Sequence, residues 1–435
     1  MTDIIRRQVL GGLLAGSVAA SGAQEPAASE PPASLWRPWK DLFASSAVSV
    51  LEFIPEQLHA LIRNQTCRTD LAPFINAAIQ HVLSRSGGGT LFFPAGSYEV
   101  SEIDATNADP TQFSTALRLV GEGRFASVIR PAKPGGVLLN AAGRNGMTVQ
   151  SLQFDSTRFA SQTAIYLCRT QSSPNCNNNR FFDVLMSGNY SRASVVAVAA
   201  ESTTWLSCRF ENVNADARHR CFATANRAQA VSVAPRTPIA ALASSNTDNV
   251  MMDCEFYAPY ERAEPVLYAG AAAYAMQGCT VITGDASQSR LVTYRPDGEV
   301  FNGPVTWTAP HFEVFGTGNV VHFLDAPAGV SYFRSIHSQG GNYVIGSDTD
   351  LLSFDARRTS AQPVLMASTW TVPACPWDAR NLRFCVFGLS DSVIDIKIGD
   401  GVGELDVTGY VADSRVVAAR ETIARTVTST GRARP

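Results

Sequence analysis

The sequence predicts an all-β chain folded as a single-stranded, right-handed parallel β-helix (a solenoid), with a capping α-helix at its N-terminal end. Two observations support this fold class. First, residues 70–100 combine an amphipathic helical pattern with a glycine-rich strand, a turn and a second strand. Second, similar short strands recur behind that segment at a spacing of about 23 residues. Such a period, with no amphipathic helix inside it, is typical of one solenoid coil per repeat.

The composition indicates a chain that can bury a large core. Of its 435 residues, 45% are hydrophobic and 17% are charged, which excludes an intrinsically disordered protein. The formal net charge of −3 gives no basic excess, so no nucleic-acid partner is expected. After the N-terminal segment no run of about 18 apolar residues occurs, so no integral membrane span is expected.

Residues 1–23 have the composition of an export signal. Arg6 and Arg7 precede the short apolar run 9–20 and the small residues 21–23. Paired arginines before a weakly hydrophobic, glycine-rich run resemble a twin-arginine signal, and an ordinary secretory signal is the alternative. We therefore expect a periplasmic or secreted protein.

Residues 71–83 predict the capping helix, because their apolar side chains recur at helical spacing and share one face. The residues of that face are Leu71, Phe74, Ile75, Ala78, Ile79, Val82 and Leu83. Thr69 or Asp70 can supply the N-cap oxygen. The glycines at 87–89 end the helix, since glycine tolerates a left-handed backbone. A strand, a turn and a second strand follow over residues 90–100.

A family resemblance rests on this cap. The helix, followed by Gly-Gly-Gly-Thr-Leu-Phe-Phe-Pro-Ala-Gly-Ser-Tyr at residues 87–98, resembles the N-terminal cap of the pectate-lyase-like superfamily of β-helix proteins. Residues 53–56 and 62–66 are similar to the segment that precedes this cap in tailspike-type members, and residues 119–123 fit the next turn. The resemblance covers residues 50–130 and implies the fold. It leaves the reaction open, because the superfamily includes lyases, hydrolases, epimerases and non-catalytic spikes.

One column of residues defines the repeat. Its members are Leu185, Cys208, Val231, Cys254 and Cys279, with successive spacings of 23, 23, 23 and 25 residues. Leu152 precedes Leu185 by 33 residues, which corresponds to one coil plus an insertion near residues 169–179. The strand pattern then loosens but continues to about residue 390. We expect the following parts: a signal over 1–23, a linker over 24–49, the cap and first coils over 50–130, the β-helix over 131–390, and a C-terminal cap or tail over 391–435.

Strand alternation directs the column residues into the solenoid, together with the residues two places later. Those later residues are Phe154, Phe210, Phe256 and Val281. Cys208, Cys254 and Cys279 are therefore expected to be small core residues rather than metal ligands or disulfide partners. Two other cysteine pairs have loop spacing that allows a disulfide: Cys168 with Cys176, and Cys375 with Cys385.

The loops after the column strands are expected to leave the solenoid along one edge. Arg209, Asp253 and Glu255 are expected on the adjoining outer strand face. Tyrosines, arginines and carboxylates concentrate there, a composition that suits a glycan, because aromatic faces stack on sugar rings and charged groups bind hydroxyls and uronates. The expected substrate-binding residues are Tyr190, Arg192, Arg209, Arg236, Tyr257, Tyr260 and Glu264.

Two reactions on an acidic, uronate-containing glycan are open. A lyase needs a base, for which His219 or an arginine is a candidate, and an acid such as Tyr257 or Tyr260. A hydrolase needs two carboxylates, about 5–5.5 Å apart for retention or about 6.5–9.5 Å for inversion. The catalytic candidates are Asp216, Arg218, His219, Arg220, Asp253, Glu255, Glu261 and Arg262.

The alternative function is a non-catalytic β-helix that binds a glycan or takes part in exopolysaccharide assembly or attachment. His311, His322 and His337 are expected to be structural, and Asn246-Thr247-Asp248 is expected to be a turn. No cofactor and no metal site is predicted. Ca²⁺ stays open without support, since no dense aspartate cluster occurs. The oligomeric state is open as well, with a trimer as one option.

Overall fold

A computed structural model shows the fold of the chain. The residues it describes are 47–107, 116–170, 176–214, 220–225, 233, 235, 246–270, 272–295, 300–301, 304–325, 332–333, 336–345, 349–355, 364–365, 368–374, 381–390, 393–400, 404–412 and 415–420. The expected export signal over 1–23 and most of the linker lie outside these residues. Among the helices that are described, none is both long and apolar enough to span a membrane.

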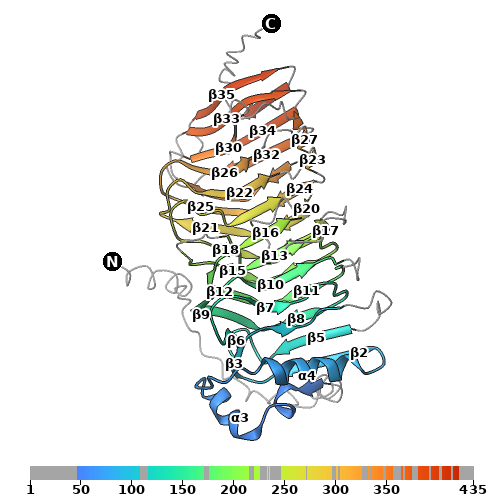
Figure 1. Cartoon of the computed structure of the whole chain (residues 1–435). Coiled ribbons are helices and arrows are strands. Elements are labelled where there is room, and N and C mark those ends of the chain that lie inside the picture. Colours follow the sequence, from blue (N-terminus) through green and yellow to red (C-terminus); the bar gives the residue numbers. More distant parts are fainter. Residues whose placement is uncertain are drawn as a thin grey trace, which may run out of the picture. The chain divides into compact units, whose positions relative to one another are not determined.

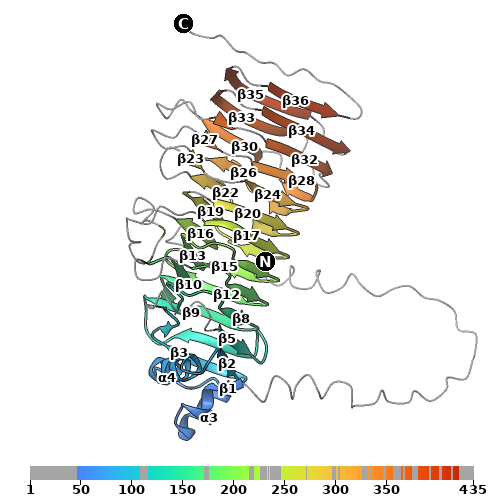
Figure 2. The ribbon, with the colours of Figure 1, turned by 90° about the vertical axis from the view of Figure 1, so that its right-hand side faces the viewer.

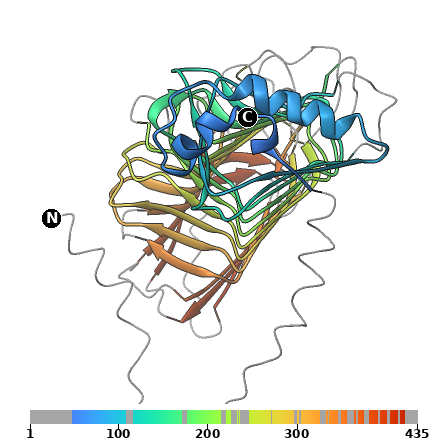
Figure 3. The ribbon, with the colours of Figure 1, turned by 90° about the horizontal axis from the view of Figure 1, so that it is seen from below.

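The described chain is a right-handed parallel β-helix, as the sequence predicts. Coil after coil, the chain adds strands to three long parallel sheets, here called sheets A, B and C (Figures 1 and 2). Seen from below in Figure 3, the coils lie over one another and a helix crosses the end of the stack. The three sheets enclose one continuous hydrophobic core.

The strands follow one another in chain order within each sheet. Sheet A contains β1 (Ala47–Ser49), β2 (Gly88–Phe93), β5 (Ala116–Gly121), β8 (Thr148–Gln150), β11 (Arg180–Phe182), β14 (Thr204–Leu206), β17 (Asn246–Met252), β20 (Ala272–Gln277), β24 (Val305–Thr308), β28 (Ile336–Gln339), β32 (Ser368–Ala374), β34 (Val393–Asp400) and β36 (Arg415–Arg420). Sheet B contains β3 (Gly96–Val100), β6 (Ser127–Pro131), β9 (Gln153–Ser161), β12 (Leu185–Tyr190), β15 (Arg209–Glu211), β18 (Glu255–Tyr257), β21 (Thr280–Gly284), β25 (His311–Val314) and β29 (Asn342–Ile345). Sheet C contains β4 (Ile103–Asp104), β7 (Val137–Asn140), β10 (Thr163–Cys168), β13 (Val195–Val198), β16 (Phe222–Ala225), β19 (Val266–Ala269), β22 (Arg290–Arg295), β26 (Asn319–Leu324), β30 (Thr349–Asp355), β33 (Asn381–Ser390) and β35 (Glu404–Ala412). A small further sheet contains β23 (Val300–Phe301), β27 (Tyr332–Phe333) and β31 (Val364–Leu365).

Coil strands continue beyond the end that the sequence indicates. The expected boundary lies near residue 390, but β34, β35 and β36 extend sheets A and C to Arg420. These three strands therefore belong to the solenoid, where a C-terminal cap or tail was expected.

The N-terminal cap contains the 3-10 helix η1 (Val50–Glu52) and the helices α3 (Glu56–Arg63) and α4 (Ala72–Leu83). Helix α4 confirms the predicted amphipathic helix, and its buried face packs against β2, β4 and β5. Asp70 Oδ1 accepts the backbone N–H of Ala72 at 3.0 Å. Gly88 has φ of +81°, and a Cβ there would lie 1.9 Å from the carbonyl oxygen of Ala116, so the first coils can stack only with glycine at this position.

The inward column is confirmed for the cysteines and corrected at two other positions. Cys208, Cys254 and Cys279 are buried, as are the residues two places later, Phe210, Phe256 and Val281. Leu185 is not in the column, because it pairs with Arg209 on the outer face; Val184 takes the inward place.

The coil expected around Val231 is absent from the described sheets. Strands β14 and β15 pair directly with β17 and β18, so the coil of Cys208 is followed by that of Cys254. Val231 itself lies outside the described residues. The chain from Cys208 to Cys254 was expected to form two coils. It forms one coil, with an insertion between β16 and β17.

The corner between sheets A and B has the same backbone in successive coils. One residue there adopts a left-handed conformation, with φ between +51° and +60°: Ser151, Asp183, Ser207, Asp253 and Gly278. The corner turns the chain from sheet A into sheet B and sends the next side chain of the column inward. Asp, Ser and Gly suit it, since short polar residues and glycine visit this region most readily.

The structure also tests the predictions made for His322, for Asn246 and for the pair of Cys168 and Cys176. His322 is fully buried, and burial lowers its pKa to about 3, so it is a neutral core residue. Asn246 begins strand β17 rather than a turn; its side chain accepts the N–H of Ala200 and donates to the carbonyl of Ala225. Cys168 and Cys176 are free thiols, so the disulfide suggested for them is not formed. Cys375 and the side chain of Cys385 lie outside the described residues.

Candidate functional site

The candidate site lies on the outer face of sheet B. Along these strands one residue points into the core and the next points out. The first outward row is Gln153, Leu185, Arg209, Glu255 and Thr280, in register from coil to coil. The second row lies two residues later and includes Asp155, Ser187, Glu211, Tyr257 and Ile282. Stacked registers therefore bring side chains that are far apart in sequence into contact.

A cavity of about 500 Å³ opens on this face, at the side nearer the corner between sheets A and B. Its lining consists of Arg124, Phe125, Leu185, Ser207, Cys208, Arg209, Glu211, Asp253 and Glu255. Three carboxylates and an exposed aromatic ring thus surround one open space.

Arg209 joins two of the carboxylates. Its guanidinium nitrogens lie 3.6 Å from Glu211 Oε1 and 3.5 Å from Glu255 Oε1. The ring centroid of Tyr257 is 5.6 Å from the same guanidinium. Because both carboxylates contact a single cation, they are held as neighbours on adjacent coils.

Glu211 and Tyr257 have shifted pKa values. Burial raises the pKa of Glu211; Arg209 partly offsets this, whereas the charges of Glu255 and Asp155 raise it further. The pKa of Tyr257 is also raised, first by burial and then by Glu211. Glu211 therefore keeps its proton to a higher pH than an ordinary glutamate, as a general acid requires.

Asp253 reaches the cavity from the corner. Its left-handed backbone, with φ of +51°, turns the carboxylate out of the coil. A Cβ on Gly278 in the next coil would lie 2.6 Å from Asp253 Oδ1, so the glycine leaves space for this carboxylate.

The rim of the cavity comes from the turn between β5 and β6. Phe125 is 69% exposed, and Arg124 lies over its ring at 5.0 Å. Arg124 also pairs with Asp183 at 3.3 Å. Sequence reasoning missed both rim residues and Glu211. The signals were a large aromatic in an otherwise small and polar turn, and, for Glu211, its place two residues after Arg209.

Four of the predicted site residues come together at this cavity: Arg209, Asp253 and Glu255 line it, and Tyr257 lies beside Arg209. Tyr190, predicted to bind substrate, is instead in the core, where its hydroxyl donates to the carbonyls of Phe154 and Ser187.

Arg220 and Glu264 are also corrected. Arg220 Nε lies 2.7 Å from Glu264 Oε2, and both side chains are buried. Burial alone would raise the pKa of Glu264, but Arg220 and Arg295 lower it below its ordinary value. This pair is a buried ion network on the sheet C side and does not line the cavity.

The remaining candidates are not part of the cavity lining. Tyr260, Glu261 and Arg262 are exposed in the turn between β18 and β19, where Arg262 Nε donates to Gln288. Arg192 is in the turn between β12 and β13. The others lie outside the described residues: Asp216, Arg218, His219 and Arg236. Within the described ranges, no group of three or more His, Cys, Asp or Glu residues is arranged to hold a metal ion.

No protein-family model matches this chain, and no curated protein matches it significantly. Among solved structures, it is similar to ORF18 of Geobacillus virus E2, with 14% identity and a TM-score of 0.43 over 88% of this chain and 63% of that one. It is also similar to the A-module of mannuronan C-5 epimerase AlgE6 from Azotobacter vinelandii, with 14% identity and a TM-score of 0.41 over 85% of this chain and 99% of that one. The surface protein and adhesin PfbA of Streptococcus pneumoniae has 11% identity and a TM-score of 0.42 over 86% of this chain and all (100%) of that one. The chain thus spans less than two thirds of the viral protein. These likenesses are too distant to indicate a reaction, and the fold rests on the sheet topology itself.

Proposed function

We propose that the protein is a glycan hydrolase that cleaves its substrate in the cavity on sheet B. One observation carries this proposal. The side chains of Glu211 and Glu255 both contact the guanidinium of Arg209, but the two carboxyl groups lie in different environments. Glu211 is the more buried of the two, and its pKa is raised. Two carboxyl groups in distinct environments are the usual basis for dividing acid and base roles in glycoside hydrolysis.

Glu211 is the proton donor in this mechanism. Its neutral carboxyl group protonates the glycosidic oxygen as the bond to the sugar breaks. Glu255, with Asp253 beside it, supplies the second carboxylate, which either activates water or attacks the anomeric carbon. Arg209 positions both glutamates and binds sugar hydroxyls with its free N–H groups.

Phe125 provides a stacking surface for a sugar ring at the rim. A ring that is 69% exposed beside a polar cavity buries apolar area when a sugar covers it.

Elimination, the other reaction considered from the sequence, needs a base. His219 and Arg218 lie outside the described residues, Arg220 is buried in its ion pair with Glu264, and Arg262 lies in the exposed turn between β18 and β19. Hydrolysis is thus the reaction that the described geometry favours.

The proposal includes the cellular location of the enzyme. The export signal expected over residues 1–23 would deliver the enzyme to the periplasm or the medium, where polysaccharides are accessible. Fractionation of cells that produce the full chain checks this.

The test is hydrolysis of a panel of neutral and acidic polysaccharides, followed by the release of reducing ends. Glu211→Gln is expected to lower kcat by about 10²- to 10⁴-fold, because the general acid is lost. Glu313→Gln is the matched control: it removes a half-buried carboxylate on the same face of sheet B, in β25, outside the cavity lining.

Two results would overturn the proposal. One is the absence of new reducing ends from every glycan in the panel, with binding retained, which indicates a non-catalytic glycan-binding protein. The other is an increase in absorbance from unsaturated uronates, which indicates a lyase.

A further inference from the structure

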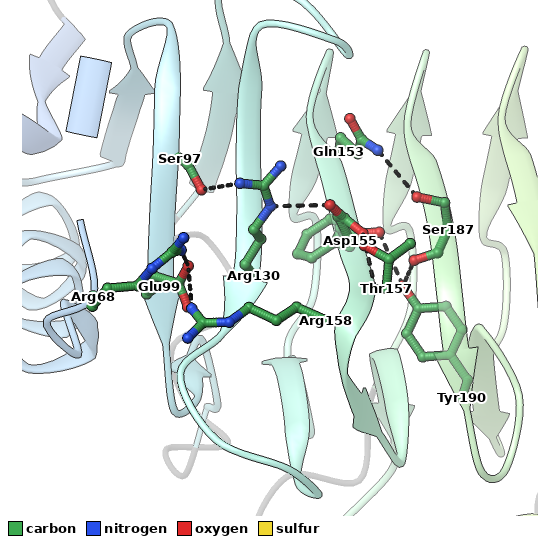
Figure 4. A network of polar contacts seen from close by, with 11 residues as sticks. Arg68, Ser97, Glu99, Arg130, Gln153, Asp155, Thr157, Arg158, Ser187 and Tyr190 are labelled. Atoms are coloured by element: carbon green, nitrogen blue, oxygen red, sulfur yellow. Dashed lines mark hydrogen bonds and ion pairs between the residues drawn. The ribbon is translucent and has the colours of Figure 1, made fainter. Parts of the chain in front are cut away.

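A second polar cluster lies on sheet B nearer the N-terminal cap (Figure 4). Glu99 on β3 is 1% exposed, and its carboxylate pairs with Arg68 at 2.8 Å and with Arg158 at 3.4 Å. One coil further, Arg130 pairs with Asp155 at 3.0 Å. Three arginines thus face two carboxylates, which leaves one positive charge in excess within this cluster.

Arg158 and Arg68 are the exposed donors of the cluster, and Arg158 is the one without a short contact to Glu99. Its guanidinium lies 4.6 Å from the ring centroid of Phe159, and its side chain is 43% exposed. It contacts the two oxygens of Glu99 at 3.4 and 3.5 Å, whereas Arg68 holds the same carboxylate at 2.8 Å. Stacking on a ring fixes a guanidinium and leaves its N–H groups free in the plane. Arg158 can therefore donate to an anionic ligand without breaking a tight ion pair.

The cavity has the opposite charge balance. With Glu211 protonated, the carboxylates of Asp253 and Glu255 face one unshared arginine, Arg209, because Arg124 is already paired with Asp183. A uronate ring bound against Glu255 and Asp253 would be repelled by both. An uncharged ring would meet no such penalty.

The distance between the Arg158 cluster and the cavity suits a polymeric ligand. The guanidinium of Arg158 meets Glu99 on β3 (Figure 4), and in sheet B the strands β6, β9 and β12 lie between β3 and β15, which carries Arg209. At roughly 4.8 Å per strand, four steps span about 19 Å, or about four sugar units. A glycan lying along the outer face of sheet B can thus reach both at once.

We infer that Arg158 and Arg68 bind an anionic substituent, a carboxylate or a sulfate ester, on a sugar that lies toward the N-terminal cap from the cleaved bond, while the cavity holds an uncharged sugar. The inference rests on the proposed function, since the cavity marks the cleaved bond. It specifies the substrate class as a heteroglycan that contains both charged and uncharged sugars, rather than a uniform polyuronate.

The test measures binding, with the full chain carrying Glu211→Gln so that turnover does not affect the result. The probes are oligosaccharides of hyaluronan (a carboxylate on alternate sugars), chondroitin sulfate and desulfated chondroitin, together with oligogalacturonate and cello-oligosaccharide. Binding is measured by titration calorimetry at low and physiological salt. Cleavage by the wild-type chain is scored separately, so that a failure of hydrolysis and a failure of anion binding are told apart.

Three substitutions make the result specific. Arg158→Gln is expected to weaken binding of the alternating probes about tenfold, which corresponds to about 1.4 kcal/mol, the scale of one charge-assisted hydrogen bond. Glu99→Gln is expected to strengthen it several-fold, because it removes the carboxylate that competes for both arginines. Arg180→Gln, an exposed arginine on sheet A, is the control and is expected to change nothing.

The sign of the Glu99→Gln effect separates a binding site from a structural network, which would lose stability with no gain in affinity. Tighter binding of the sulfated probe than of its desulfated form identifies a sulfate ester, and the reverse identifies a carboxylate. The inference is overturned if oligogalacturonate or the neutral probe binds best, if no anionic probe binds, or if Arg158→Gln and Arg180→Gln behave alike.

Discussion

At the scale of single residues, Glu211 is the group on which several influences converge. Burial and the charges of Glu255 and Asp155 favour its protonated form, and the guanidinium of Arg209 opposes them. Because the opposing influence comes from one side chain that contacts Glu211 directly, at 3.6 Å, the balance can be changed by one substitution.

Replacing Arg209 with methionine should raise the pKa of Glu211 further. The change removes the positive charge that favours the ionised carboxylate, so the proton leaves at higher pH. Titration of the Glu211 side-chain carboxyl by NMR measures this directly, and the alkaline limb of any hydrolytic pH profile should move in the same direction. Arg180→Met, on the outer face of sheet A, serves as the control. A lower or unchanged pKa would refute the assigned role of Arg209.

Sequence alternation predicted part of this site for a clear reason. Phe210 and Phe256 point inward, so Arg209 and Glu255 one place earlier must point outward, and Glu211 and Tyr257 one place later follow the same rule. Tyr190 was missed for a different reason, because it was expected in the loop that follows the strand. Strand β12 continues to Tyr190, and alternation from the buried Met186 turns the tyrosine inward. The point at which a strand ends leaves no periodic signal in the sequence.

At the scale of elements, the N-terminal cap depends on the backbone at two adjacent glycines. Gly87 and Gly88 both have a left-handed backbone, with φ of +82° and +81°. They differ in surroundings: a Cβ on Gly87 would meet nothing within 4 Å, whereas one on Gly88 would overlap the carbonyl of Ala116. The pair therefore separates backbone strain from steric overlap.

Gly87→Ala should cost about 1–2 kcal/mol of stability, the usual price of a left-handed alanine. Gly88→Ala should cost clearly more, because the strand β5 must also move away from β2. Urea denaturation of the two variants and the wild-type chain gives the comparison. Equal losses would mean that the close approach at Ala116 contributes nothing.

The false coil at Val231 shows where a sequence period is ambiguous. The chain between Cys208 and Cys254 is two periods long, yet it forms one coil plus an insertion. Spacing alone cannot distinguish an insertion of one period from a coil. What distinguishes them is strand pairing, which depends on contacts between residues distant in sequence.

At the scale of the whole molecule, each coil contacts chiefly the coils next to it, as in other solenoids. The interior of the solenoid contains a stack of aromatic side chains. Phe210 lies 4.8 Å from Phe256 and 5.3 Å from Trp205, measured between ring centroids. A loss at one point of such a stack should spread to neighbouring coils before it reaches the ends.

Phe210→Ala should destabilise the fold by about 3–5 kcal/mol, because it leaves a cavity in the core. Native-state hydrogen exchange should accelerate most in β14–β20, while α4 and β2 in the cap keep their protection. Phe125→Ala, at an exposed ring, should leave both stability and exchange unchanged. Uniform loss of protection along the chain would show that the coils unfold as a single unit.

The left-handed corner between sheets A and B also bears on how this scaffold can change over evolutionary time. Ser207 and Asp253 occupy equivalent corner places in adjacent coils, and both line the cavity. Exchange between serine, aspartate and glycine there is compatible with the backbone, because all three accept its conformation. A single nucleotide substitution exchanges aspartate and glycine, or glycine and serine, so a carboxylate at the mouth of the cavity can be lost in one step, or gained from serine in two, without disturbing the hydrophobic column behind it. Substitutions at this corner can therefore change the substrate specificity while the fold of the coil is retained.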